Sequence, residues 1–410
     1  MSTLGLAVVA LFVVGFGLVS KRIQTTVVTA PMVFVLFGVA IGPGGFGLLD
    51  VALDSPAVRL LAELTLVLVL FTDAARIDLV RLRREHNIPV RLLGIGLPLT
   101  VLVGTLTGVA LLSELTLWEA LVLAVILAPT DAALGQAVVS SSRVPVRIRQ
   151  ALNVESGLND GLALPFLLFR FALFQVVLGP VVGAAVGYFG GRLVSWGGRR
   201  EWMSDAFRDL AALGLALLAY AGAEVVGGNG FIAAFTAGLT LGNTARSLCS
   251  SLYEFAEAEG QLLMLLSFLV FGAVMVGPAL DGLGLASVFY ALSSLTLVRM
   301  VPVWLSLTGL GLEPATRAFL GWFGPRGIAS ILYGLLLLEG SQLDHQGAVF
   351  GVTMLTILLS VFLHGITAWP GVRWYGGWAE SMKDEPDQPE MRPVSEMPVR
   401  LPYDESQGRV

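Results

Sequence analysis

The feature that most constrains this chain is a succession of long apolar segments separated by short polar ones. A helix needs about 20 predominantly apolar residues to cross the hydrocarbon core of a bilayer. About thirteen segments meet that rule, and they centre near residues 12, 34, 67, 100, 128, 160, 186, 215, 235, 270, 295, 326 and 357. They lack the alternation of apolar and polar residues typical of membrane strands. The sequence therefore predicts an all-α polytopic membrane protein.

The composition supports this interpretation. Only 13% of the residues are charged and 55% are hydrophobic, whereas roughly 25% are charged in soluble domains. The mean hydropathy is +0.80. These values argue against a globular protein with a large core, and we expect membrane lipid, and neither a nucleic acid nor a cofactor, as a partner.

Basic residues set the predicted orientation. Few follow the even-numbered spans, with Arg59 as the main exception. Because basic loops stay in the cytoplasm, the odd-numbered loops and the C-terminus are predicted to be cytoplasmic, and the N-terminus to lie outside. The basic residues after odd-numbered spans are Lys21, Arg22, Arg76, Arg81, Arg83, Arg84, Arg143, Arg147, Arg149, Arg199, Arg200, Arg208, Arg246, Arg317 and Arg373.

The charge distribution divides the chain into two parts. Residues 1–372 hold the predicted spans and form a transmembrane domain. Residues 373–410 are acidic, proline-rich and poor in apolar side chains. Such a segment buries too little apolar surface to fold alone, so we predict a disordered cytoplasmic tail.

Two of the predicted spans are interrupted. The fifth contains LAPTDAALGQ (127–136) and the twelfth contains GWFGPRGIAS (321–330). Span n and span n+7 run in opposite directions, so the chain divides into two six-helix inverted repeats in which these two spans correspond. Corresponding interruptions in two halves indicate the binding site of a transporter. Proline and glycine in both segments predict that the helices unwind near the middle of the bilayer.

Several polar residues are predicted to lie at this same depth. Asp131 is in the fifth span and Arg326 in the twelfth, while NVESGLNDG (153–161) lies in the sixth. There, Ser156 and Asp160 share one helical face. Inserting a charged acid at mid-membrane costs at least about 2.5–3.5 kcal/mol of free energy, so such an acid is first interpreted as part of a functional site.

The chemistry of these groups favours a hard cation or a proton. Carboxylate, hydroxyl and carbonyl oxygens bind hard cations, whereas zinc and copper prefer imidazole or thiolate. The three histidines, His86, His345 and His364, fall in loops or near the end of the last span. We therefore expect no transition-metal site.

Other acids have competing interpretations. Glu155 and Arg326 fit a buried structural ion pair, because a buried acid needs a partner. Arg299 in the eleventh span is another base at membrane depth. Asp73, at the cytoplasmic end of the third span, fits either an interfacial ion pair or the ion site.

Four motifs together resemble a known family. APTDAALGQAVV, NVESGLNDGLALP, GGNGFIAAFTAGLTLGN and FGPRGIAS are similar to the monovalent cation/proton antiporters, in the bacterial and archaeal sodium/proton branch related to the animal sodium/hydrogen exchangers. The resemblance extends to about residue 372. It implies thirteen spans, inverted repeats, two unwound helices that cross, and a homodimer in the plasma (inner) membrane.

The resemblance also implies roles for individual residues. Asp160 would be the essential ion- and proton-binding carboxylate, and Asp73 would reach the ion. Glu155 and Arg326 would form a structural bridge, and Asn159 is typical of electroneutral relatives. The groups that would complete the cation site are Thr130, Asp131 and Ser156.

These features predict a secondary antiporter and not an enzyme. We expect it to exchange Na⁺, with Li⁺ or K⁺ as alternatives, for H⁺ in a 1:1 electroneutral cycle that serves pH homeostasis. Cation and proton would compete for Asp160, because protonation removes the charge that holds the cation. A cation channel or gated K⁺ efflux protein could use the same carboxylates. An intramembrane aspartyl protease would need two aspartates, which Asp131 and Asp160 formally supply.

Overall fold

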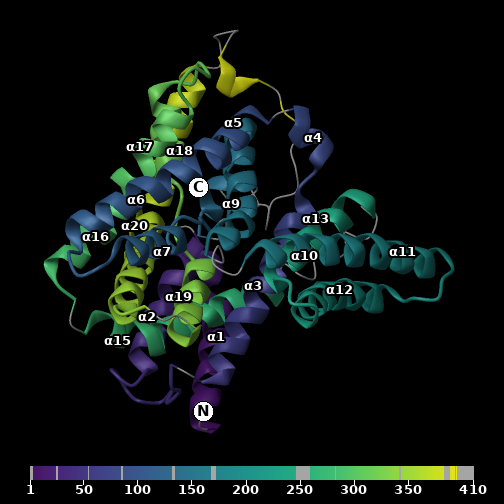
Figure 1. The fold of residues 1–410 in the computed structure, drawn as a ribbon, viewed down its shortest axis with the longest axis horizontal. Coiled ribbons are helices and arrows are strands. Elements are labelled where there is room, and N and C mark those ends of the chain that lie inside the picture. Colours follow the sequence, from purple (N-terminus) through teal and green to yellow (C-terminus); the bar gives the residue numbers. More distant parts are fainter. Residues whose placement is uncertain are drawn as a thin grey trace.

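A computed structural model of the chain shows an assembly of helices (Figure 1). The residues that it describes are 3–24, 26–53, 55–84, 86–131, 134–167, 172–245, 259–281, 283–340, 343–382, 388–392 and 394.

The first half contains α1 (Thr3–Gln24), α2 (Ala30–Ile41), α3 (Pro56–Arg76), α4 (Leu79–Arg84), α5 (Asn87–Arg91), the π-helical η1 (Leu92–Gly96), α6 (Leu97–Leu111), α7 (Leu117–Ile126), α8 (Gln136–Val139) and α9 (Val146–Leu167). The second half contains α10 (Ala172–Ala185), η2 (Val186–Gly190), α11 (Gly191–Arg199), α12 (Asp205–Val225), α13 (Gly230–Thr244), a helix over 259–270, η3 (Phe271–Met275), α15 (Val276–Leu280), α16 (Leu285–Leu295), α17 (Leu297–Ser306), α18 (Pro314–Trp322), α19 (Ile328–Gly340), α20 (Gln346–Ser381) and the 3₁₀ turn η4 (Pro389–Met391).

The all-helical prediction is confirmed. Each predicted span centre falls within a helix or, near residues 128 and 326, at a break between two helices. Among the described residues, six helices are long and apolar enough to cross a membrane, and several shorter apolar helices accompany them.

Local sequence signals explain where several helices begin. Pro56 and Pro314 occupy first-turn positions of α3 and α18, where a missing N–H costs nothing. Thr116 and Glu119 form a capping box at the start of α7, with the Thr116 N–H donating to Glu119 Oε2 at 2.9 Å. Asn229 caps α13 through its side-chain oxygen.

Glycines allow neighbouring helices to pack at backbone distance. A Cβ added to Gly238 of α13 would lie 2.1 Å from the Phe71 carbonyl oxygen of α3. One added to Gly242 would lie 2.0 Å from the Ala75 carbonyl oxygen. Any larger residue would force α3 and α13 apart, which is the usual reason for small residues at membrane helix contacts.

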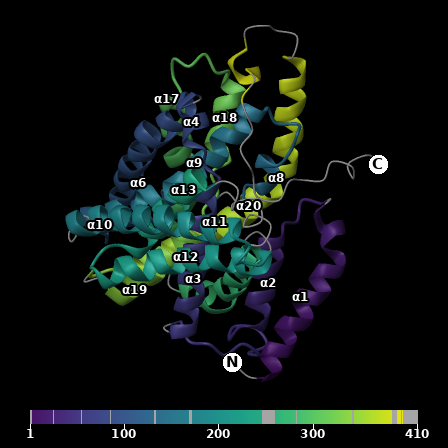
Figure 2. The same ribbon diagram turned by 90° about the vertical axis from the view of Figure 1, so that its right-hand side faces the viewer.

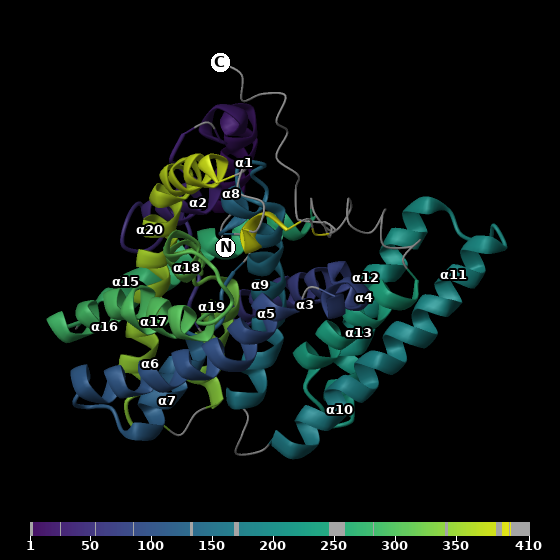
Figure 3. The same cartoon turned by 90° about the horizontal axis from the view of Figure 1, so that it is seen from above.

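The helices form a central body with a lateral extension. Helices α10, α11 and α12 reach out from the body, and α13 joins them to α3 (Figures 1 and 3). Helix α1 lies at the edge of the molecule (Figure 2), and few of its residues are buried. The two interrupted spans lie within the body, which positions the candidate site there.

Beyond α20, the described residues include the short 3₁₀ turn η4. Helix α20 continues to Ser381, past the boundary predicted at residue 372, and most of residues 383–410 lie outside the described part of the chain. In η4, Glu390 is 1% exposed and its Oε1 accepts from the Glu313 N–H at 2.8 Å and the Thr316 hydroxyl at 2.9 Å. Arg147 of α9 donates to the Pro389 carbonyl. This turn therefore caps α18 and ties it to α9, while the division into a membrane domain and a disordered cytoplasmic tail stays a prediction.

We expect Glu390→Ala to lower the free energy of unfolding by about 2 kcal/mol, because hydrogen bonds to a charged group are worth roughly 1.5–3 kcal/mol. Thermal unfolding of the detergent-solubilised protein would measure the loss. Glu114→Ala, at an exposed glutamate between α6 and α7, is the control and should change stability by no more than about 0.5 kcal/mol. Equal stability of the two variants would show that the turn does not hold α18.

Candidate ion-binding site

The fifth span breaks where the sequence predicted. Helix α7 ends at Ile126, residues 128–131 are irregular, and α8 begins at Gln136; residues 132 and 133 lie outside the described residues. The end of α7 is held from the twelfth span. Arg326 Nη1 donates to the carbonyls of Ala128 at 2.9 Å and Pro129 at 3.1 Å. These carbonyls lie in the unwound segment just past the C-terminal end of α7, where the helix dipole favours a cation.

The twelfth span breaks in the same region. Helix α18 ends at Trp322, residues 323–327 are irregular, and α19 begins at Ile328. The two breaks meet through the Asp131 N–H, which donates to the Pro325 carbonyl at 2.8 Å. The prediction that two interrupted helices cross is therefore confirmed.

The side chain of Asp131 reaches from the fifth-span break to the start of α19. Its Oδ2 accepts from the Ile328 N–H at 3.1 Å, where the helix dipole favours a negative charge. A Cβ at Gly327 would lie 1.9 Å from that same oxygen, so only glycine leaves room for the carboxylate. Asp131 thus couples the two breaks through both its backbone and its side chain.

Three polar residues link the fifth break to α9. Thr130 Oγ1 lies 3.0 Å from Ser156 Oγ and accepts from Asn159 Nδ2 at 2.6 Å. All three residues are buried. Their arrangement places two hydroxyl oxygens side by side on one level of the site.

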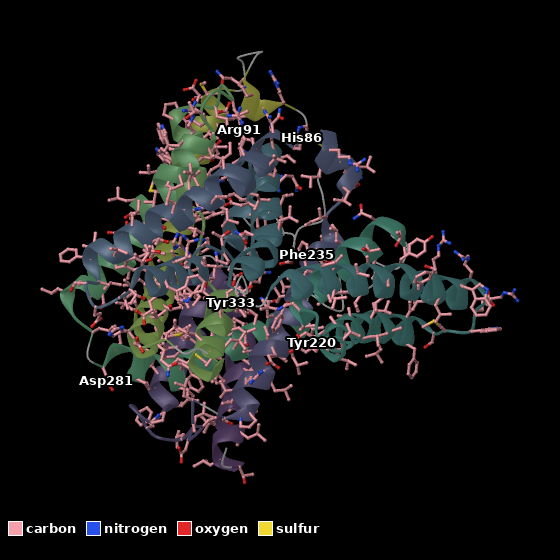
Figure 4. All side chains as sticks on the ribbon, viewed as in Figure 1. His86, Arg91, Tyr220, Phe235, Asp281 and Tyr333 are labelled. Carbon is pink, nitrogen blue, oxygen red and sulfur yellow. The ribbon has the colours of Figure 1, made fainter. Side chains whose placement is uncertain are left out.

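Asp160 follows on the same helix. It is 7% exposed, and the Tyr333 hydroxyl of α19 donates to its backbone carbonyl at 3.0 Å. Next to it, a Cβ on Gly161 would lie 3.0 Å from the Phe235 ring of α13. Figure 4 shows Tyr333 in the central body and Phe235 where α13 approaches it. Asp160 therefore lies on the part of α9 that contacts α13 and α19.

Asp73 also approaches this part of α9. Its Cβ lies 3.7 Å from the position that a Cβ on Gly157 would occupy. Asp73 is partly exposed near the end of α3. The structure thus brings Asp73 beside the helix turn that carries Ser156.

The predicted partner of Glu155 is wrong. Glu155 Oε1 lies 2.5 Å from Arg299 Nη1 of α17, and both side chains are almost fully buried. Arg326 is instead directed to the carbonyls of Ala128 and Pro129, which leaves Arg299 as the base that neutralises Glu155. Arg299 also contacts the twelfth break, since a Cβ on Gly324 would lie 2.6 Å from its Nε.

His364 also lies elsewhere than predicted. We expected it near the end of the last span and away from the site, but α20 continues to Ser381, so His364 lies well inside that helix. There it is buried, and its Nε2 lies 2.9 Å from the Trp322 carbonyl at the end of α18. Polar residues near the breaks that the sequence did not single out include Ser330, whose hydroxyl donates to the Ile126 carbonyl at 2.7 Å, together with Tyr333, Ser360 and His364.

Comparison with known proteins identifies the family. Residues 8–374 match the family described as "Sodium/hydrogen exchanger, transmembrane". The chain belongs to this exchanger family. It is a multi-pass membrane protein.

Curated members of the exchanger family carry two kinds of name. The chain is 28% identical over 375 residues to "K(+)/H(+) antiporter NhaP" of Alkalimonas amylolytica, covering 87% of this chain and 64% of that protein. It is 26% identical over 355 residues to "Na(+)/H(+) antiporter ApNhaP" of Aphanothece halophytica, with coverages of 77% and 65%. The chain therefore spans somewhat less than two thirds of these relatives.

A solved structure supports the fold. The sodium proton antiporter MjNhaP1 from Methanocaldococcus jannaschii at pH 8 superposes with a TM-score of 0.74 and 21% identity, covering 91% of this chain and 99% of that one. At this identity the likeness concerns the fold alone. The overall arrangement of the helices is thus similar in the two chains.

Proposed function

We propose that this protein is a secondary antiporter that exchanges a monovalent cation for H⁺. Na⁺ is the first candidate, and Li⁺ and K⁺ are the alternatives; relatives with both Na⁺/H⁺ and K⁺/H⁺ in their names fit this range. The observation that carries the proposal is the position of the buried Asp160, one helical turn from Ser156 and beside the crossing of two interrupted spans. A carboxylate at that position can bind either a cation or a proton, and the proton neutralises it.

The remaining groups would complete the cation site. Ser156 and Thr130 offer hydroxyl oxygens, and Asp131 and Asp73 offer carboxylates, all of which are ligands suited to a hard cation. Asn159 would fix the Thr130 hydroxyl by donating to it. The ion pair of Glu155 and Arg299 would stabilise the site without binding the ion. Arg326 would do the same through the carbonyls of Ala128 and Pro129.

Coupling follows from charge. With either ion bound, Asp160 no longer carries an uncompensated charge, and the site can change its access from one side of the membrane to the other. The empty site would have to carry a bare carboxylate through an apolar barrier, which costs several kcal/mol. Exchange is then obligatory, and one cation against one proton moves no net charge.

We further propose that the protein acts as a homodimer in the plasma membrane, with its C-terminus in the cytoplasm. The basic residues after odd-numbered spans support this orientation. The dimer is proposed from the family resemblance.

Proton flux in proteoliposomes tests the proposed exchange. With a pH dye inside, pulses of Na⁺, Li⁺ or K⁺ should move protons, and the rate should be unchanged when valinomycin and K⁺ clamp the voltage during Na⁺ and Li⁺ pulses. A rate that saturates with cation concentration and falls with added protons would support competition at one site. Cation movement without proton movement, or only as a voltage-driven current, would overturn antiport and favour a channel.

A further inference from the structure

The break in the twelfth span is supported by one face of α20. Ser360, His364, Thr367 and Gly371 follow one another at intervals of four, three and four residues, which places them along a single helical stripe. Each contacts residues between 322 and 326. We call these four residues the α20 stripe.

His364 holds the last carbonyl of α18. Its Nε2 lies 2.9 Å from the Trp322 carbonyl, to which the ring donates in the tautomer that carries the proton on Nε2. Nδ1 faces back to its own helix, 3.2 Å from the Ser360 hydroxyl and 3.0 Å from the Ser360 carbonyl. The imidazole is thus fixed between α20 and the end of α18.

Ser360 holds the opposite side of the break. Its Oγ accepts the Arg326 N–H at 2.7 Å, and both residues are fully buried. This N–H belongs to the residue whose guanidinium binds the end of α7. Ser360 therefore fixes the backbone from which Arg326 reaches the fifth-span break.

The other two members of the stripe hold the aromatic residues at the break. Trp322 Nε1 donates to Thr367 Oγ1 at 2.9 Å, and its ring stacks on His364 with centroids 5.1 Å apart. A Cβ on Gly371 would lie 2.5 Å from the Phe323 ring, so glycine makes room for that ring. The break is therefore held in a defined conformation.

We propose that Ser360 and His364 are positioning residues for ion exchange: they fix the unwound segment 323–327 so that Asp131 and Arg326 meet the fifth-span break. This inference rests on the proposed antiport. It assigns no ion contact to either residue. Their effect on the ion passes through the Pro325 carbonyl and the Ile328 N–H, which hold Asp131.

Four variants test the proposal. His364→Leu removes the donor to Trp322, whereas His364→Gln keeps an amide N–H that can reach the same carbonyl. Ser360→Ala removes the acceptor for the Arg326 N–H and is the mildest change. Thr353→Val is the matched control, because the buried Thr353 hydroxyl donates only to the Val349 carbonyl of its own helix among the described contacts.

Hydrogen–deuterium exchange measures the break without any transport. The amides of peptides covering 322–331 should take up deuterium faster in His364→Leu and Ser360→Ala than in the parent. In Thr353→Val they should take it up at the parent's rate. One lost hydrogen bond corresponds to an exchange increase of about fivefold to tenfold. His364→Gln should return most of the protection.

Transport kinetics supply the second measurement. The apparent KM for the cation should rise about fivefold to tenfold in His364→Leu and Ser360→Ala, with the maximal rate reduced less and His364→Gln close to the parent. The proposal would be overturned if His364→Leu and Ser360→Ala matched Thr353→Val in both hydrogen–deuterium exchange and KM. It would also be overturned if KM rose while hydrogen–deuterium exchange stayed unchanged. A parent protein that moves no protons would instead refute antiport, while the exchange data would still decide whether the stripe holds the break.

Discussion

We expect Asp160→Asn to reduce cation-driven proton movement to the level of protein-free liposomes. Asparagine has nearly the same shape as aspartate but neither carries a charge nor releases a proton at ordinary pH. It can therefore serve neither of the two states between which the proposed cycle alternates. The measurement is the proteoliposome flux assay, with equal amounts of folded protein verified by size-exclusion chromatography.

One contact of Asp160 is kept in this variant. Tyr333 donates to the backbone carbonyl of Asp160 and not to its carboxylate, so the contact between α9 and α19 survives the substitution. Thermal unfolding would verify that the variant is folded, and binding of the cation should be lost together with transport.

Asp131→Asn is the matched control for charge. Its amide oxygen can still accept the Ile328 N–H, so the crossing of the two breaks should persist. We expect weaker cation binding with exchange still measurable. Undiminished exchange by Asp160→Asn would contradict the proposed role of Asp160, and complete loss in both variants would assign the two carboxylates equal roles.

The general architecture could be predicted from the sequence because its signals are local. Apolar length defines a span, and Pro129 in one span and Gly-Pro-Arg-Gly at 324–327 in the other disrupt a helix wherever they lie. Thr130, Ser156 and Asn159 could be selected because they flank such a break or share a helical stripe with Asp160. Their mutual hydrogen bonds follow from helices that cross at one depth.

Partner choice could not be predicted in the same way. Glu155 had two buried bases within reach at similar depth, and span positions do not say which guanidinium turns toward it. The outcome depends on the carbonyls of Ala128 and Pro129, which become available only once the fifth span unwinds and which bind Arg326. A role for His364 could not be predicted for a related reason, because its contact with the Trp322 carbonyl depends on how α20 packs against the end of α18.

Substituting one member of the Glu155–Arg299 ion pair should cause the second large effect, a loss of stability. Removing one partner of a buried ion pair leaves an uncompensated charge and destabilises a protein by about 3–5 kcal/mol. We expect this loss for both Glu155→Leu and Arg299→Met, since each partner is almost fully buried and the two atoms lie 2.5 Å apart. Denaturation of the solubilised protein, followed by tryptophan fluorescence, would measure the change.

The double variant distinguishes the observed pair from the one that the sequence predicted. Replacing both members of a buried pair by apolar residues of similar volume is often neutral or stabilising, so Glu155→Leu combined with Arg299→Met should recover most of the loss. Glu155→Leu combined with Arg326→Met should not recover it, because Arg299 would stay buried without its acid and the carbonyls of Ala128 and Pro129 would lose their donor. Recovery only in the second combination would mean that Arg326, and not Arg299, neutralises Glu155 in the membrane.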